Sequence, residues 1–489
     1  MSEAGKAAVD VQRDEDGTRV VIVGAGPAGI RAAQTLVAAG LRPMVIDENA
    51  RWGGQIYRQP PEGAGFVREK SALYGFEAGK ADALHRCMAE LLPRLDYRPD
   101  TLVWSCEPGT LDVLRAGREA RLRWSHLIIA CGATDRVVPV PGWTRPGVYT
   151  LGGAQVALKA QGCAIGRRTV FAGTGPLLYL VAYQYARAGA EVAAVLDTSP
   201  FARQVAATPK LLRQPGTFAK GLYYLGWLRS HGVRVERGVT LDGVDGGPAV
   251  QAVRWRSADG AQHRIDCDAL GLGFGLRPET QLADLAGCRF RFDTLNRCWL
   301  PERDAAGRSS VPGVYLAGDG AGIAGADAAE LAGRRAALAL LEDLGLKAGR
   351  DDAGPGAAAI EQRLARIGVF RAGIEQAFAP PPTEAARHWP DDMIVCRCEA
   401  VTAGQLRGCI RSGMASEVNR LKALTRIGMG RCQGRMCGEA AMALLAAETG
   451  RALDQVGRPR GQAPIKPIPI SPMLFEDGVS VLEEEAHDE

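Results

Sequence analysis

One stretch near the beginning, residues 18–49, constrains the fold of this chain more than any other. It consists of the apolar run Val20–Val23, a glycine-rich turn, a helix-forming segment, and a second apolar run that ends in acidic residues. A short, continuously apolar run between turns is typical of a parallel strand buried on both faces. The order strand, turn, helix and strand predicts a Rossmann-like unit in an α/β fold.

The glycine-rich turn of this unit has the GxGxxG spacing that suits a dinucleotide. The first glycine permits a tight turn, the second lets the backbone approach a pyrophosphate, and the third lets helix and strand pack closely. The amino terminus of the helix offers free N–H groups and positive potential to the phosphates. An acid at the end of the second strand can accept hydrogen bonds from a ribose; we expect Asp47 there, with Glu48 as the alternative. The predicted contacts are Gly24, Gly26, Pro27, Ala28, Gly29, Asp47 and Glu48.

Three further segments resemble the two-dinucleotide-domain flavoproteins, the broad group that includes the pyridine-nucleotide-disulfide reductases. The sequence RWGGQIYR, residues 51–58, lies where that group has a Gly-Gly turn beside the flavin. LIIACGATDRVVPVPG, residues 127–142, resembles the strand and turn that close the first part of the FAD domain. VPGVYLAGDGAG, residues 311–322, resembles the late FAD motif, whose aspartate binds the ribityl chain. The resemblance implies FAD and adds the contacts Gly53, Gly54, Gln55, Ala130, Gly132, Gly318, Asp319 and Ala324, the last near the expected start of a helix aimed at the flavin.

One feature departs from the disulfide reductases. Those enzymes follow the Gly-Gly turn with a CxxxxC pair, whereas this chain continues as GGQIYRQPP, without a cysteine. We therefore expect no disulfide chemistry at this position.

A second strand–turn–helix–strand unit spans residues 168–197. Gly173 and Gly175 repeat the first two glycines, but Leu178 occupies the third glycine position, where a larger side chain should push the helix away from the strand. Asp197 could still meet a ribose. We expect a domain that keeps the fold but binds NAD(P) poorly or not at all; a working nucleotide site is the alternative. The segment DALGLGFGLRPE, residues 268–279, then returns the chain to the FAD domain, so the second domain is inserted in the first.

Four cysteines near the C-terminus form two pairs. Cys396 and Cys398 are separated by one residue, and Cys432 and Cys437 by four. Four thiolates near the two ends of a short, mostly helix-forming segment that starts at a plausible cap, Thr402, can enclose a small metal centre. A tetrahedral zinc site is the main alternative, although zinc sites usually use CxxC spacing; core thiols are the other.

Charge in this segment favours iron and sulfide over zinc. Between residues 391 and 440 there are eight basic residues against five acidic ones, and Arg397, Arg431 and Arg435 adjoin the cysteines. Positive charge near an anionic [2Fe–2S] cluster would favour its reduction. A merely solvated basic face is the other interpretation of these arginines.

The cysteine segment, CRCE followed by TRIGMGRCQGRMC, resembles the bacterioferritin-associated-ferredoxin type of [2Fe–2S] domain, and the tail RPRGQAPIKPIPISPM extends the resemblance. Behind an FAD domain, it resembles the larger flavoprotein subunit of opine oxidases, D-hydroxyproline dehydrogenases and hydrogen cyanide synthase. This family implies a hetero-oligomer, in which a smaller subunit of the D-amino-acid-oxidase type oxidises the amine and this chain passes electrons to an acceptor. It also allows a small third subunit, and FMN at a subunit interface by analogy with sarcosine oxidases.

The whole chain is therefore predicted to be a two-dinucleotide-binding-domain flavoprotein with a small, mainly helical [2Fe–2S] domain. The expected parts are an FAD domain in two segments (18–150 and 276–345), a degenerate NAD(P)-type domain (151–275), a helical linker (346–390), the cluster domain (391–452), and a Pro-rich and acidic tail (453–489). The net charge of +4 argues against a nucleic-acid binder. The first seventeen residues are polar and no apolar run is long enough to span a bilayer, so we expect a cytoplasmic location.

The sequence identifies no catalytic residue, because it contains no recognisable nucleophile motif, His–Asp pair or paired carboxylates. Two alternatives to the electron-transfer subunit remain. One is a self-sufficient NAD(P)H-dependent flavin oxidoreductase, which requires a working second unit. The other is a binding protein with a structural metal and a vestigial flavin fold.

Overall fold

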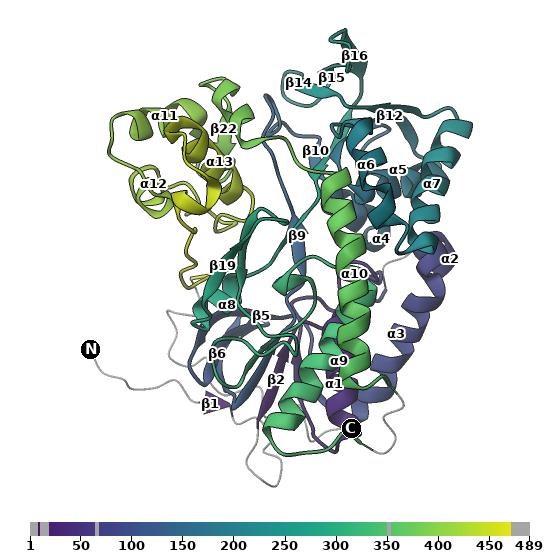
Figure 1. Ribbon diagram of the computed structural model, residues 1–489, viewed down its shortest axis with the longest axis vertical. Coiled ribbons are helices and arrows are strands. Elements are labelled where there is room, and N and C mark those ends of the chain that lie inside the picture. Colours follow the sequence, from purple (N-terminus) through teal and green to yellow (C-terminus); the bar gives the residue numbers. More distant parts are fainter. Residues whose placement is uncertain (1–7, 10–18, 64–67, 350–353, 471–489) are drawn as a thin grey trace.

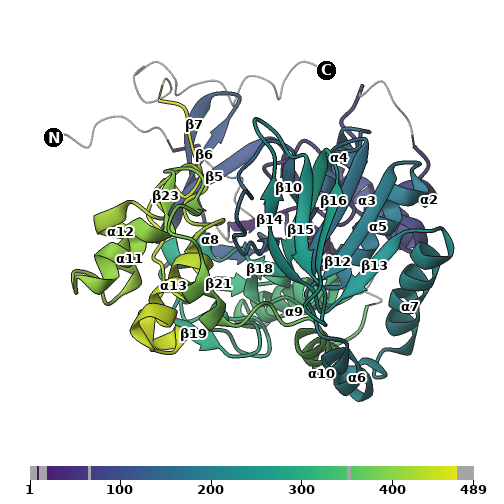
Figure 2. The ribbon, with the colours of Figure 1, turned by 90° about the horizontal axis from the view of Figure 1, so that it is seen from above.

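The computed structural model describes residues 8–9, 19–63, 68–349 and 354–470. Three bodies are visible in Figure 1: one built around β2 at the bottom, a second around β12 at the upper right, and a small helical one at the upper left. Seen from above in Figure 2, the small body and the second sheet lie on opposite sides of the molecule.

The lower body contains a five-stranded parallel sheet in the order β21-β8-β2-β3-β4. These strands are β2 (Val20–Val23), β3 (Met44–Ile46), β4 (Asp96–Arg98), β8 (His126–Ile129) and β21 (Val314–Leu316). All four residues of β2 are buried, as expected for a central strand. The strand order places the glycine-rich turn between the ends of β8 and β3, at the carboxyl edge where α/β folds bind ligands.

Each face of the first sheet is covered differently. One face packs against the helices α1 (Pro27–Ala38), α3 (Ala78–Leu91) and α9 (Ala326–Asp343). The other face packs against a sheet made of β1 (Ala8–Val9), β5 (Thr101–Glu107), β6 (Thr110–Arg115) and β7 (Arg118–Arg123), and against α8 (Gln281–Leu285). The short helix α2 (Lys70–Tyr74) precedes α3.

The second body repeats this plan. Its parallel sheet has the order β10-β17-β11-β12-β13, formed by β10 (Val148–Thr150), β11 (Arg168–Thr174), β12 (Glu191–Asp197), β13 (Arg234–Arg237) and β17 (Ala269–Phe274). The helices α4 (Leu151–Ala160), α5 (Pro176–Arg187) and α7 (Pro215–Ser230) cover one face. The antiparallel strands β14 (Thr240–Asp245), β15 (Ala252–Arg256) and β16 (Gln262–Asp266) cover the other.

The second body is inserted in the first. The chain leaves through β9 (Ala133–Asp135) and returns through β18 (Leu276–Pro278), and these two strands pair antiparallel with each other. The hairpin of β19 (Phe290–Asp293) and β20 (Cys298–Pro301) follows before β21. The expected helical linker is α10 (Ala357–Ala377), which packs against α9 and against α6 (Phe201–Leu211) and so runs between the two bodies (Figure 1).

The small C-terminal body has its own buried core. It contains the hairpin β22 (Ile394–Cys396) and β23 (Val401–Thr402), and the helices α11 (Ala403–Arg411), α12 (Val418–Thr425) and α13 (Gly438–Thr449). The expected cap is confirmed: Thr402 accepts a hydrogen bond from the Gln405 N–H, and the Gln405 side chain returns to the Thr402 backbone. In the described parts of the chain, every helix is too short or too polar to cross a bilayer.

Candidate functional site

The glycine-rich turn between β2 and α1 is held by backbone contacts. The Gly24 N–H donates to the Ile46 carbonyl at 2.7 Å. A Cβ atom at Gly29 would lie 1.8 Å from the Gly24 carbonyl oxygen, so only glycine lets α1 come this close to the strand. Gly26 caps α1 without a side-chain hydrogen bond, and Pro27 begins the helix. The N–H groups of the first turn are therefore left to a ligand, which suits phosphate.

The two acidic residues after β3 have different environments. Asp47 is only 7% exposed, and its Oδ2 accepts from the Ala25 N–H at 2.6 Å while Oδ1 accepts from the Asn49 N–H at 2.8 Å. Burial raises the pKa of Asp47, and these hydrogen bonds oppose the rise. Glu48 is partly exposed and pairs with Lys466. Asp47 therefore fixes the shape of the glycine-rich turn, and Glu48 is the carboxylate that remains accessible.

The Gly-Gly turn lies directly against the glycine-rich turn. Gly53 N–H donates to the Ala25 carbonyl at 2.9 Å, and a Cβ atom at Gly54 would lie 3.0 Å from the Gly26 Cα. Gln55 is exposed and accepts from the Arg58 guanidinium at 2.9 Å.

A lysine that the sequence did not single out lies behind the Gly-Gly turn. Lys159 on α4 is 3% exposed and donates to the Ile56 carbonyl at 3.0 Å. Burial and the nearby Arg58 lower the pKa of Lys159 to about 8. The turn where a flavin is expected is thus supported by a buried amine.

The late FAD motif, residues 311–322, and the turn after β8 lie at the same carboxyl edge of the first sheet. The carboxylate of Asp319 accepts from the Ala324 and Gly325 N–H groups, at 2.8 and 2.9 Å, and so orders the entrance to α9. This helix begins at Ala326, two residues after the expected position, because Asp319 holds residues 324 and 325 outside the helix. The structure thus brings the predicted contacts together at the carboxyl edge of one sheet. Their backbones approach closely: a Cβ atom added at Gly318 would lie 2.9 Å from the Ala28 Cβ, and one added at Gly24 would lie 2.4 Å from the Ala130 carbonyl oxygen.

The four cysteines also come together. Cys396 ends β22, Cys398 lies in the following turn, and Cys432 and Cys437 belong to the loop between α12 and α13. Hydrogen bonding from Cys437 lowers the pKa of Cys396 to about 6 and that of Cys432 to about 5, while the pKa of Cys437 itself is raised. Backbone N–H groups also donate to the sulfurs of Cys396 and Cys432, so these two side chains are the ones favoured as thiolates, whereas burial raises the pKa of Cys398.

The arrangement of the sulfurs bears on the choice of metal. The thiols interact with one another: Cys437 is a hydrogen-bond partner of Cys396 and of Cys432, and Cys432 is a partner of Cys398. A [2Fe–2S] cluster has two metal ions to share among four thiolates, so this donor set fits it. The fit is tight, since a Cβ at Gly430 would lie 2.3 Å from the Cys398 Cβ.

A buried ion pair attaches the cysteine loop, the loop between α12 and α13 that carries Cys432 and Cys437, to the first body. Arg435 binds both carboxylate oxygens of Glu279, at 2.6 and 3.1 Å, and the two side chains are only 12% and 10% exposed. The Gln281 side chain donates to the Gln433 carbonyl at 2.6 Å. Glu279 N–H in turn donates to the Gly132 carbonyl at 3.0 Å, beside the β8 turn. One residue, Glu279, therefore touches both the predicted flavin edge and the cysteine loop.

Glu279 is a functional residue that the sequence did not predict. Its partner Arg435 lies 156 positions away, and no local pattern links them. Of the arginines expected to surround the cluster, Arg435 is thus neutralised, while Arg397 lies over the Trp143 ring at 5.8 Å. Trp143 also donates to the Ile394 carbonyl at 2.6 Å, which is a second attachment of the cysteine-bearing segment.

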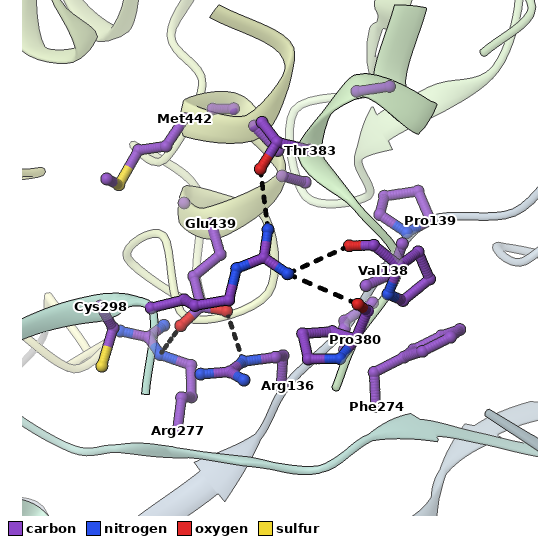
Figure 3. A pocket seen from close by; sticks show the side chains of 18 of the residues that line it. Arg136, Val138, Pro139, Phe274, Arg277, Cys298, Pro380, Thr383, Glu439 and Met442 are labelled. Carbon is purple, nitrogen blue, oxygen red and sulfur yellow. Dashed lines mark hydrogen bonds and ion pairs between the residues drawn. The ribbon is translucent and has the colours of Figure 1, made fainter. Parts of the chain in front are cut away.

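A cavity of about 740 Å³ lies between the small body, the linker after α10 and the second body. Eight arginine or lysine residues line it against three aspartate or glutamate residues. Figure 3 shows Glu439 between Arg136 and Arg277, at 2.8 and 3.8 Å. Arg297 donates to the Thr383 hydroxyl at 2.8 Å and to the Pro380 carbonyl at 3.4 Å. The excess of positive charge makes this cavity suitable for an anion.

The second glycine-rich turn differs from the first. Leu178 is fully buried in the core between α4, α5 and the sheet, where the first unit has Gly29 against the strand. Asp197 is fully buried as well: its Oδ2 accepts from the Tyr179 hydroxyl at 2.6 Å and the Gln204 amide at 3.1 Å, and its Oδ1 from the Ser199 N–H at 2.8 Å. The carboxylate that could have met a ribose is enclosed by protein donors.

Comparison with known proteins defines the class of this molecule. Residues 18–347 match the pyridine nucleotide-disulphide oxidoreductase family, and residues 394–447 match the BFD-like [2Fe-2S] binding domain. The chain is therefore a flavin-dependent oxidoreductase of this fold, with FAD and with a [2Fe–2S] cluster that belongs to a BFD-like domain.

Its particular family is that of HcnB and the A subunit of opine oxidase, to which the chain belongs. It is 36% identical over 468 residues to the opine oxidase protein of Agrobacterium tumefaciens (strain Ach5), covering 92% of this chain and 90% of that protein. It is 36% identical over 469 residues to hydrogen cyanide synthase subunit HcnB of Pseudomonas aeruginosa, covering 93% and 97%. L-proline dehydrogenase from P. horikoshii shares the fold, with a TM-score of 0.69, 21% identity and coverage of 93% and 79%.

Proposed function

We propose that this chain is the electron-transferring subunit of a multi-subunit amine or amino-acid dehydrogenase or oxidase. The observation that carries the proposal is the Arg435–Glu279 ion pair, which binds the loop of Cys432 and Cys437 to the edge that bears the predicted FAD contacts. Its relatives are named as subunits, of opine oxidase and of hydrogen cyanide synthase. The substrate would be an opine, hydroxyproline, glycine or a similar amine.

In this proposal the amine is oxidised by a separate, smaller flavoprotein subunit of the D-amino-acid-oxidase type. When bound, a flavin exchanges electrons in pairs or singly and a [2Fe–2S] cluster exchanges them one at a time. The residues of this chain hold the two groups at a fixed separation and keep water from the path between them. Glu279 and Arg435 are each about nine-tenths buried at that junction. The final acceptor and a small third subunit complete the proposed complex.

We assign the FAD contacts to the predicted residues at the carboxyl edge of the first sheet. The first turn of α1 offers N–H groups to the pyrophosphate, and Glu48 is the carboxylate within reach of the adenosine ribose, because both oxygens of Asp47 are occupied by the backbone. Cys396, Cys398, Cys432 and Cys437 are assigned as the ligands of the cluster.

The cationic cavity supports a further part of the proposal, FMN at the interface with the partner subunit. Its excess of positive side chains suits a phosphate, and Glu439 at its wall is two residues from Cys437. Flavin released from the purified complex would contain FMN as well as FAD if this part is right. FAD alone would refute it without affecting the electron-transfer role.

An NAD(P)H-dependent reductase is disfavoured by the second body. Leu178 fills the position of the third glycine, and Tyr179, Gln204 and Ser199 occupy Asp197, the acid expected to bind a nucleotide ribose there. A protein with only a structural metal is disfavoured by the match of residues 394–447 to the BFD-like [2Fe-2S] binding domain.

The test is to co-express the chain with the products of neighbouring genes and purify it under anaerobic conditions. We expect a stable complex with a second flavoprotein, acid-labile sulfide in the preparation, and bleaching of the flavin by one of the candidate amines. NADH or NADPH should leave the flavin oxidised on the same time scale. Zinc in place of iron, or rapid bleaching by NADPH without amine, would overturn the proposal.

A further inference from the structure

The segment that follows the cluster domain returns to the flavin domain. We call residues 457–470 the C-terminal strap. Near its beginning, Arg458 forms an ion pair with Asp284 at 2.8 Å, and the Gly461 N–H donates to the same carboxylate at 2.6 Å. Further along, the Ile465 N–H donates to the Trp104 carbonyl on β5 at 3.0 Å. The strap is therefore attached along its length to the flavin domain.

Ile465 anchors the strap in two directions. Its side chain is 3% exposed and belongs to the core between the first sheet and the β5–β7 sheet. Its carbonyl accepts from the Arg435 guanidinium at 2.6 Å, which also binds Glu279. Because Ile465 is fixed by the core and by the cysteine loop, the position of the next residue, Lys466, is fixed as well.

Lys466 lies over the edge of the sheet where the glycine-rich turn begins. Its ammonium pairs with Glu48, which follows β3. On the other side it is near Cys131, which follows β8: burial raises the pKa of the Cys131 thiol to about 12, and the charge of Lys466 opposes part of that rise. In the sheet, β2 lies between β3 and β8. The ion pair therefore places the ammonium at the end of β3, beside the strand that leads into Gly24, and its charge reaches Cys131 after β8.

We propose that Lys466 is a phosphate-binding side chain of the flavin site, supplied by the strap beyond the cluster domain. This inference rests on the proposed FAD contacts. Lys466 and the N–H groups of α1 would together hold the phosphates of FAD, and Glu48 would accept hydrogen bonds from the ribose. Arg58 is a second cation in this region, since the charges of Asp47 and Glu48 both act on its guanidinium. A lysine in the strap also links flavin retention to correct docking of the cluster domain, through Ile465 and Arg435.

The test measures FAD binding rather than turnover. FAD release from the full-length holoprotein is followed by the recovery of free-flavin fluorescence at increasing KCl, for wild type, Lys466→Ala and Lys466→Arg. Lys70→Ala is the matched control, since Lys70 also forms a partly exposed ion pair, with Asp82, on another part of the flavin domain. Visible circular dichroism of the cluster checks that the cysteine domain is intact in each variant.

We expect Lys466→Ala to weaken FAD binding about tenfold, the effect of losing one charge-assisted contact, and to reduce its dependence on KCl. Lys466→Arg and Lys70→Ala should stay within about twofold of wild type. FAD binding by Lys466→Ala equal to that of Lys70→Ala would overturn the role of Lys466 alone. Absence of FAD from the wild-type protein would instead overturn the flavin site itself.

Discussion

The ion pair between Glu279 and Arg435 can be tested by removing its negative charge. Glu279→Gln keeps the shape of the side chain but leaves the guanidinium of Arg435 buried without its carboxylate partner. Breaking a buried pair on one side costs about 3–5 kcal/mol. Both side chains are about one-tenth exposed and Arg435 keeps its bond to the Ile465 carbonyl, so we take the lower value, about 3 kcal/mol.

The change should mainly reduce the free energy with which the cysteine loop docks on the flavin domain. About 3 kcal/mol corresponds to roughly a 150-fold change in the equilibrium between docked and undocked loop. Native-state hydrogen exchange measures it directly, because amides of residues 430–438 exchange through the undocked state. We expect their exchange in Glu279→Gln to accelerate by about two orders of magnitude. Electron transfer between flavin and cluster, followed by rapid mixing, should slow as well.

The matched control is Arg426→Gln. Arg426 pairs with Glu399 at 2.7 Å in the same domain, but its side chain is 65% exposed, so its loss should cost less than about 0.5 kcal/mol. Combining Glu279→Gln with Arg435→Gln should recover part of the loss, because the unpaired charge is then gone. Unchanged exchange in Glu279→Gln, or strictly additive effects of the two changes, would refute the reasoning.

Three further outcomes are expected. Lowering the pH should release the loop, because burial would raise the pKa of Glu279 but the attraction of Arg435 outweighs it and holds that pKa below its ordinary value. The stabilisation by Glu279 is complete above the pKa of the unfolded state and should disappear as the pH falls through the pKa of the folded state. Hydrogen exchange measured at decreasing pH checks this, and Glu279→Gln should not show the effect. Cys398→Ser should abolish the acid-labile sulfide. Cys409→Ser changes a buried packing position, so it should keep the sulfide and lower the free energy of unfolding by about 1 kcal/mol. Equal sulfide in both variants would contradict the ligand assignment. Gly29→Ala should abolish FAD binding, since its Cβ would lie 1.8 Å from the Gly24 carbonyl oxygen. The control, Gly79→Ala, lies in open space within α3 and should bind FAD normally and gain about 0.5 kcal/mol of stability. Flavin absorbance measures the binding, and thermal unfolding measures the stability.

The sequence predicted the features whose causes are local. The burial of Val20–Val23, the need for glycine at position 29 and the cap at Thr402 each follow from a few neighbouring residues, and the structure contains all three. The distinct environments of Asp47 and Glu48 could not be predicted in this way. Asp47 is occupied by the Ala25 N–H across the turn, and Glu48 is paired with a lysine more than four hundred positions away.

Long-range contacts set the rest of the site. The sequence placed Arg435 beside the cluster because it lies two positions before Cys437, but only the folded chain brings Glu279 to it. The same is true of Leu178, whose substitution for glycine was visible in the sequence, while the closure of Asp197 depends on Tyr179 and Gln204. Backbone patterns therefore locate cofactor sites, whereas the charges that tune and connect them come from elements that meet only in three dimensions.

The antiparallel pairing of β9 with β18 has a consequence for how such a chain could have arisen. Asp135 and Leu276 are direct partners in this ribbon, so the ends of the segment between them are only about 5 Å apart. A segment with neighbouring ends can be acquired by gene fusion without cutting any strand of its host, and closing the host without it would cost little chain entropy. Asp197 lies within that segment, so a change in its surroundings need not disturb the ribbon that joins the segment to its host.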